Sequence, residues 1–228
     1  MHIISRRILV IFGFAILLSV AGLALAQTPP PASNAAVTSG QDQQTPTGKF
    51  IQDLGNRAIG VVTDKNLTSA QRSAQYDALL REAFDLPTIG HFVLGRAWST
   101  ATPQQQQEYM KLFEDSVVKI YGDRLSFYSG ESFHVKNVRQ ESEKDSVVTS
   151  EIDHPGGEQP TRVDWRVRQD NGKLAIVDVS VEGVSQSVTQ RDEYTAILQR
   201  NNGNIDALLN LMRERLQKPA SPKSSAAQ

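Results

Sequence analysis

The 228-residue sequence contains no cysteine, so it offers neither a disulfide framework nor a cysteine nucleophile. Its four histidines are scattered, and none stands at the spacing that common metal motifs need. A Gly-x-Ser-x-Gly turn and a phosphate-binding glycine loop are also missing. These absences argue against the commonest hydrolases and nucleotide enzymes, and we expect no catalytic centre, no cofactor and no metal ion.

Strong charge of either sign is missing as well. The 24 basic and 25 acidic side chains give a net charge of −1 at pH 7. Proteins that bind nucleic acid usually carry a clustered basic surface. No such cluster is visible here, so we expect no nucleic-acid partner.

The only long hydrophobic run stands at the N-terminus. Arg6 and Arg7 precede apolar residues 8–20, and the small-residue pattern Ala24-Leu25-Ala26 follows. This order predicts a secretory signal peptide at 1–26, cleaved after Ala26. An uncleaved membrane anchor is the alternative, because the run is nearly long enough to span a bilayer. Both interpretations place the rest of the chain outside the cytoplasm, and the lack of cysteine is typical of a periplasmic protein.

Composition divides the remainder into one domain with two tails. Residues 27–48 are rich in Pro, Gln and Ala and are predicted to be a disordered linker, because they cannot bury enough apolar surface to offset ordering entropy. Residues 218–228 form a second predicted tail. The domain therefore spans about 49–217, which is long enough for one core and a cavity.

Hydrophobic periodicity changes from helical to strand-like midway through the domain. Helices are predicted at about 49–64, after Thr68, from Pro87 to Gly95, and from Pro103 to about Gly122, with two more after residue 185. Strands are predicted near 131–140, 145–153, 160–169 and 173–182. The expected fold is α+β, with a curved antiparallel four-stranded sheet at about 131–182. N-terminal and C-terminal helices should cover it and enclose an apolar cavity.

The last two predicted strands form a hairpin with one strongly apolar face. On the first strand Val163, Trp165 and Val167 alternate with charged residues. On the second, simple alternation assigns one face to Ala175, Val177, Val179 and Val181, and the opposite face to Ile176, Asp178, Ser180 and Glu182. The apolar face can cover either an ordinary protein core or a bound apolar molecule.

The most enzyme-like group in the sequence is Asp178, Ser180, Glu182 and Ser185. No histidine stands nearby to act as a base for a serine, so we favour a structural role over a hydrolase that uses Asp178 and Ser180. Charges flanked by apolar strands need partners. We therefore expect Asp164, Asp178 and Glu182 to pair with strand arginines or with Arg191, which would join the hairpin to the following helix.

Several motifs together resemble the MlaC family, also called toluene-tolerance proteins. They are Leu94-Gly95-Arg96-x-Trp98, Thr102-Pro103, Asp164-Trp165, and Asp178-Val179-x-Val181-Glu182-Gly183-Val184-Ser185 followed by Arg191. The resemblance implies a monomeric periplasmic phospholipid carrier. It would exchange lipid with an outer-membrane lipoprotein complex and with an inner-membrane ABC transporter that has an MCE-type subunit. Leu174 and Gln190 depart from the family pattern, and a hopanoid-associated branch is also similar.

From the resemblance and the apolar patterns, we expect acyl tails to lie in a cavity between sheet and helices, with phospholipid as cargo. One wall is predicted from the sheet residues Val163, Trp165, Val167, Val177, Val179 and Val181, and the opposite wall from Phe113, Val117 and Tyr121. A different class of function also remains open. If the interior is a solid core, the protein is an envelope adaptor that binds no lipid.

Overall fold

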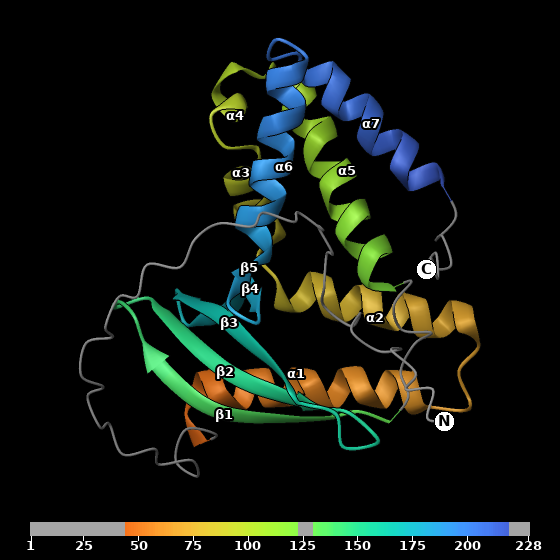
Figure 1. Cartoon of the computed structure of the whole chain (residues 1–228), viewed down its shortest axis with the longest axis vertical. Helices are drawn as coiled ribbons and strands as arrows, with labels where there is room; N and C mark the ends of the chain where they lie inside the picture. Colours follow the sequence, from red (N-terminus) through yellow and green to blue (C-terminus); the bar gives the residue numbers. More distant parts are fainter. Residues whose placement is uncertain (1–43, 123–129, 219–228) are drawn as a thin grey trace, which may run out of the picture.

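The computed structural model describes residues 44–122 and 130–218, which form a sheet layer and a helical layer (Figure 1). The sheet is an antiparallel meander with strand order β1-β2-β3-β4-β5. Its strands are β1 (Ser132–Gln140), β2 (Asp145–Asp153), β3 (Thr161–Asp170), β4 (Lys173–Val181) and β5 (Val184–Ser185). The predicted α+β fold is confirmed, and the two-residue strand β5 adds a fifth strand to the four expected.

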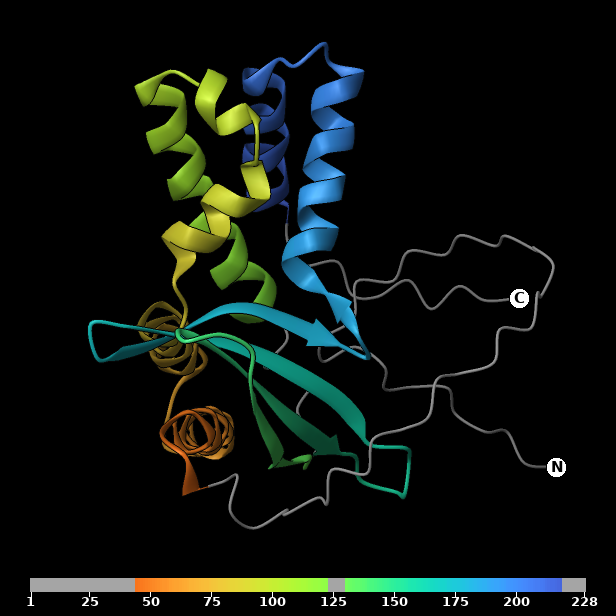
Figure 2. The ribbon, with the colours of Figure 1, turned by 90° about the vertical axis from the view of Figure 1, so that its left-hand side faces the viewer.

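Two N-terminal helices complete the sheet layer, and Figure 2 shows both nearly end-on beside the sheet. Helix α1 (Pro46–Thr63) packs against β1 and β2, and α2 (Ser69–Ala83) packs against α1 and β4. The N-cap of α2 is Thr68, as the sequence predicted, and Gln71 completes a capping box with it. Gly55 permits a close approach of α1, because a Cβ there would lie 2.3 Å from the Phe133 ring.

The interface between α1 and the sheet is a solid core. Its most buried members are at most 1% exposed: Ile51, Val135, Val148, Val163, Val167 and Ile176. Trp165 belongs to this core, where its Nε1 donates a 2.8 Å hydrogen bond to Ser150 Oγ. The Phe133 ring contacts Trp165 edge-on at 6.2 Å between centroids. On β1, β2 and β3, the side chains that point toward α1 are therefore packed against protein.

The helical layer has a second core of its own. It consists of α3 (Leu86–Leu94), α4 (Ala97–Thr100), α5 (Pro103–Gly122), α6 (Gln186–Arg200) and α7 (Ile205–Gln217). Helix α5 packs on α7, and α3 packs on α6. Tyr109, Leu208 and Leu209 are fully buried at its centre. Figure 1 shows this layer above the level of β4 and β5 and away from β1.

The C-terminal helices meet the sheet mainly through α6, which packs against β4 and β5. Ser185 ends β5 and is also the N-cap of α6, with its Oγ accepting from Val188 N–H at 3.1 Å. The helix therefore leaves directly from the edge of the sheet. Its buried residues Tyr194 and Leu198 then pack in the helical core instead of on the sheet.

The outermost described helices end close to the predicted domain boundaries. Helix α7 ends at Gln217. Helix α1 begins at Pro46, with Thr45 as N-cap, so residues 46–48 form its first turn. The predicted signal peptide, residues 27–43 of the linker and the tail from 219 lie outside the described residues. Within 44–122 and 130–218, no helix is both long and apolar enough to cross a membrane.

Candidate functional site

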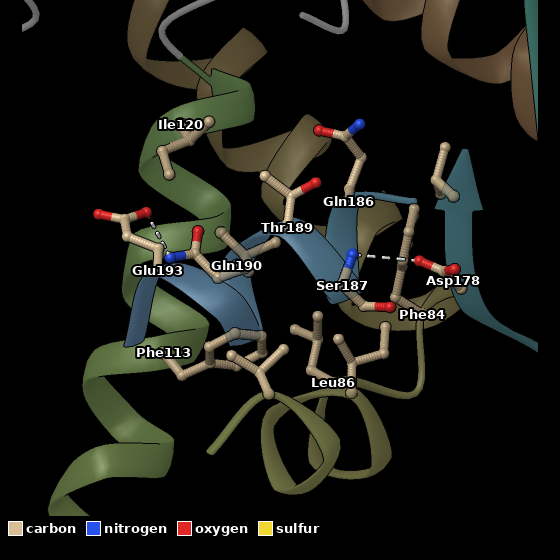
Figure 3. Close-up of a pocket in the computed structure, with 14 residues that line it drawn as sticks. Phe84, Leu86, Phe113, Ile120, Asp178, Gln186, Ser187, Thr189, Gln190 and Glu193 are labelled. Carbon is tan, nitrogen blue, oxygen red and sulfur yellow. Dashed lines mark hydrogen bonds between the residues drawn. The ribbon is translucent and has the colours of Figure 1, made fainter. Parts of the chain in front are cut away.

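A cavity of about 100 Å³ lies where the helical layer meets β4 (Figure 3). Its apolar lining consists of Phe84, Leu86, Ile89, Val93, Phe113, Val117, Ile120 and Val179. Its polar lining consists of Asp178, Gln186, Ser187, Thr189, Gln190 and Glu193. The cavity is thus amphipathic, with α3, α5 and β4 supplying the apolar side and the start of α6 supplying most of the polar side.

The apolar side is built mainly by α3 and α5. Asp85 caps α3 by accepting from Thr88 N–H at 3.0 Å, and Thr102 caps α5 with Gln105 in a reciprocal pair of hydrogen bonds. Helix α3 is apolar almost all round, which is typical of a helix with protein or cavity on most sides. The two caps fix the helices that present Ile89 and Phe113 to the cavity.

The polar side is held together by its own hydrogen bonds. Asp178 on β4 accepts from Ser187 N–H at 3.2 Å and from Ser185 Oγ at 2.7 Å, so it caps the start of α6. Gln190 Nε2 donates to Glu193 at 3.0 Å, and Arg215 of α7 forms an ion pair with Glu193 at 2.6 Å. Asp178 is therefore held by hydrogen bonds and Glu193 by a hydrogen bond and an ion pair, so both carboxylates that line the cavity have partners.

Three of the nine predicted wall residues line this cavity: Phe113, Val117 and Val179. Four others, Val163, Trp165, Val167 and Val181, pack in the core under α1, so β3 does not form a wall opposite α5. Tyr121 lies in the last turn of α5, and its side chain lies outside the described part of the structure.

A β-bulge explains the position of Val177, which is buried but does not line the cavity. Arg166 pairs with Asp178, and the next residue, Val167, pairs with Ile176, so Val177 is the extra residue on β4. On the N-terminal side of the bulge, the side chains of β4 therefore point to the faces opposite to those predicted by simple alternation. Ile176 consequently points into the core and is 0% exposed, although simple alternation assigned it to the polar face.

The predicted structural polar residues take different partners. Asp164 forms an ion pair with Arg162 on the same strand and accepts a 2.5 Å hydrogen bond from the Thr149 hydroxyl on β2. Asp178 takes neither a strand arginine nor Arg191 as its hydrogen-bond partner; it caps α6, and this cap joins the hairpin to the following helix. Arg191 instead lies over the Phe92 ring, with its guanidinium carbon 4.8 Å from the centroid.

The apolar cavity residues that the sequence did not indicate come mainly from α3 and the α2–α3 connection: Phe84, Leu86, Ile89, Val93 and, on α5, Ile120. The polar ones come from α6: Gln186, Ser187, Thr189, Gln190 and Glu193. The sequence of α3 did contain one indication that this helix lines a cavity. A nine-residue helix that is apolar on nearly every side needs more contacts than one core provides, and α3 faces both the helical core and the cavity.

The arrangement suits binding of an apolar molecule. Ser185 Oγ donates to Asp178 and has no histidine among its described partners. No group of three metal-ligating side chains occurs among the residues that the structure describes. Burial raises the pKa of Tyr109 and of Tyr194 far above the usual range, so both stay protonated. The Tyr109 hydroxyl donates a 2.9 Å hydrogen bond to Gly90 C=O.

Fold and site together define an α+β protein with an amphipathic cavity between a sheet edge and a helical layer. The sequence model of the MlaC protein family matches residues 52–214, which is most of the chain. The protein therefore belongs to the MlaC family, as the sequence motifs predicted.

Two relatives extend this assignment. Toluene tolerance protein ttg2D of Pseudomonas putida is 25% identical over 169 residues, covering 72% of this chain and 77% of the relative. The phospholipid-binding protein from Ralstonia solanacearum, solved in complex with a phospholipid, superposes with a TM-score of 0.65 at 21% identity. The match covers 74% of this chain and 95% of the Ralstonia chain, so the two proteins share their fold.

Proposed function

We propose that this protein is a periplasmic phospholipid carrier that holds acyl tails in the apolar cavity at the α3–α5–β4 junction. The observation that carries the proposal is the cavity itself: eight apolar side chains line it, and its two carboxylates are already paired. Membership of the MlaC family and a shared fold with a phospholipid-binding protein support it. The tails would enter between Phe113 and Val179.

The energetics of acyl chains explain why such a carrier is needed. A phospholipid with two long tails has about 30 methylenes, and each costs about 0.8 kcal/mol to expose to water. The total is on the order of 24 kcal/mol. Lipid therefore does not cross an aqueous compartment unaided at a useful rate, and a carrier must supply an apolar interior and no chemistry.

Loading requires the two layers to separate. The cavity of about 100 Å³ is smaller than the roughly 300–1,000 Å³ of typical ligand sites. The two cores are distinct clusters, and Phe84 is partly buried against both. The helical layer can therefore move away from β4 while each core stays packed, and the space between them grows to fit the tails.

We further propose that the chain is exported by a signal peptide cleaved after Ala26 and acts as a monomer. It would exchange lipid with an outer-membrane lipoprotein complex and an inner-membrane ABC transporter of the MCE type. A carrier that must release its cargo to either partner needs a site that opens, which the separation of the two layers provides.

Native mass spectrometry of the full chain, secreted by a Gram-negative host and purified without detergent, tests the proposal. We expect the mass of a chain starting at Gln27 plus one phospholipid. An increment that matches a hopanoid, in a host that makes them, would keep the carrier and change its cargo. A lipid-free mass that persists after incubation with liposomes would contradict the proposal and favour the envelope adaptor.

A further inference from the structure

Three exposed apolar side chains lie outside the cavity, on elements that adjoin one another. Among the residues that the structure describes, four large apolar side chains are exposed, and Ile120 alone of these lines the cavity. The others are Phe92 on α3, Val184 on β5 and Val188 on α6, which are 39%, 56% and 45% exposed. Helix α3 packs on α6, and β5 leads directly into α6. Exposed apolar side chains that gather in this way mark an interaction surface.

Arg191 of α6 joins this group and is held in place from two sides. Its guanidinium carbon lies 4.8 Å from the centroid of the Phe92 ring, within the range of a cation–π contact. The guanidinium also packs on Gly95, where a Cβ would lie 3.3 Å from it. Val188 precedes Arg191 by three residues on the same helix, so the two side chains are neighbours on one helix face.

The guanidinium of Arg191 has no acidic partner within 44–122 or 130–218, where it makes neither a hydrogen bond nor an ion pair. Most arginines in these ranges do pair with a carboxylate: Arg57, Arg81, Arg139, Arg162, Arg166, Arg168, Arg213 and Arg215. A planar guanidinium that is already fixed in place loses little entropy when it binds a carboxylate with two parallel hydrogen bonds. Arg191 is therefore prepared for an acidic group from outside this chain.

The charges around Arg191 favour a protein over an anionic lipid surface. Asp192 follows it, is exposed, and has no hydrogen-bond or ion-pair partner in the described ranges. Anionic membranes attract clusters of basic side chains, and Asp192 opposes that attraction. A protein segment can place one carboxylate against Arg191 and apolar side chains against Phe92 and Val188. Arginine and aromatic side chains are also enriched at the centres of protein interfaces.

The position of this group brings a bound partner close to the cavity without filling it. Val93 of α3 and Gln190 of α6 line the cavity. Phe92 and Arg191 are their neighbours in the sequence, on the same two helices, and do not line it. A partner that contacts Phe92 and Arg191 would therefore touch two helices that form cavity walls.

We propose that Phe92, Val184, Val188 and Arg191 form a docking surface, the α3–α6 patch, for a protein segment in which a carboxylate stands beside apolar side chains. The carboxylate would bind Arg191, and the apolar side chains would cover Phe92 and Val188. The segment would belong to a protein of the membrane complexes with which the carrier exchanges lipid. This inference rests on the proposed function and adds the surface that meets the partner.

The test measures transfer of a fluorescent phospholipid from the loaded full mature chain to vesicles. The vesicles contain either the MCE-type transporter or the outer-membrane lipoprotein complex of the same bacterium. Arg191→Glu should slow transfer to at least one complex about ten-fold or more, because a central arginine carries a large share of binding energy and a reversed charge repels the partner. Loading of this variant from protein-free liposomes should be normal. Arg200→Glu, the same change at an exposed arginine near the end of α6, should match the wild type.

Val188→Glu tests the same surface without disturbing the packing of Arg191. It places a carboxylate where the partner's carboxylate would lie, so it should slow transfer to the same complex and leave loading from protein-free liposomes normal. If Arg191→Glu does not fold, this variant decides the question. Wild-type transfer to both complexes by Val188→Glu would overturn the α3–α6 patch.

Photo-crosslinking identifies what covers the patch. Benzoylphenylalanine replaces Val188 in the full chain, and irradiation takes place in the bacterial envelope. We expect a crosslink to a protein of one complex, in a peptide that carries Asp or Glu beside apolar residues. Exchange of that acidic residue for arginine should restore transfer by Arg191→Glu, and no restoration would contradict the ion pair. A crosslink to phospholipid alone, or to a second copy of this chain, would overturn the proposal.

Failure of the patch differs from failure of the proposed function. A wild-type protein that loads no lipid, or that passes lipid to neither complex, would overturn the proposed carrier and the patch with it. Normal loading and normal transfer by the wild type, with the same rates in Arg191→Glu and Val188→Glu, would overturn the patch alone.

Discussion

We expect Val117→Glu to leave the protein folded and to lower its phospholipid occupancy by at least about 100-fold. Val117 is half-buried at the cavity, so a carboxylate there stays hydrated while the cavity is empty. Acyl tails would strip that water away, and an unpaired buried charge costs several kcal/mol. Each 1.4 kcal/mol reduces affinity tenfold, which gives the expected factor. Native mass spectrometry after incubation with liposomes measures it.

Val188→Glu is the matched control for this substitution. Val188 is 45% exposed, lies in the first turn of α6 and does not line the cavity. Glutamate at this third helical position also suits the start of a helix. We expect normal occupancy in this variant. Wild-type occupancy in Val117→Glu, with the protein folded, would show that the tails do not pass α5.

Trp165→Ala should destabilise the protein by about 3–5 kcal/mol without changing the lipid bound per folded molecule. Trp165 is 7% exposed in the core under α1, contacts Phe133 and donates to Ser150. Its removal leaves a cavity in the core under α1, and Trp165 is not among the residues that line the cavity proposed for the tails. Urea unfolding measures the stability, and mass spectrometry of the folded fraction measures the occupancy.

Trp165→Phe serves as the conservative variant and should lose less stability, because a ring still fills the space. The opposite result in Trp165→Ala would contradict the placement of Trp165 in a solid core. If Trp165→Ala kept its stability but lost lipid, the inner face of β3 would be a cavity wall, as the hairpin pattern alone first indicated.

Much of the fold could be predicted from local signals. Thr68, Thr102 and Ser185 act as helix caps in the structure. The first two could be recognised because threonine just before a helical pattern is a typical N-cap. Strand β2 was placed at its observed bounds, and the Asn171-Gly172 turn has the positive φ angles of 49° and 79° that its sequence predicts. These features depend on a few neighbouring residues, so the sequence contains them directly.

The candidate site could be predicted only in part, because it depends on contacts between distant segments. Val163 and Val179 look alike in the sequence and both pack in the core under α1, but Val179 also lines the cavity and Val163 does not. The bulge at Val177 is set by strand pairing, and no local pattern revealed it. The apolar periodicity assigned Phe84 to the stripe of the second helix, whereas in the structure it is the C-cap of α2 and lines the cavity.

The most direct test of the account is photo-crosslinking with a phospholipid that carries a diazirine at the end of one acyl chain. The full chain is loaded from liposomes and irradiated, and the labelled peptides are identified by mass spectrometry. We predict label in α3 and α5, in peptides that contain Ile89, Phe113 or Val117. Label in α1 or on β1 to β3, near Ile51 or Val163, would place the tails under α1 and contradict the account.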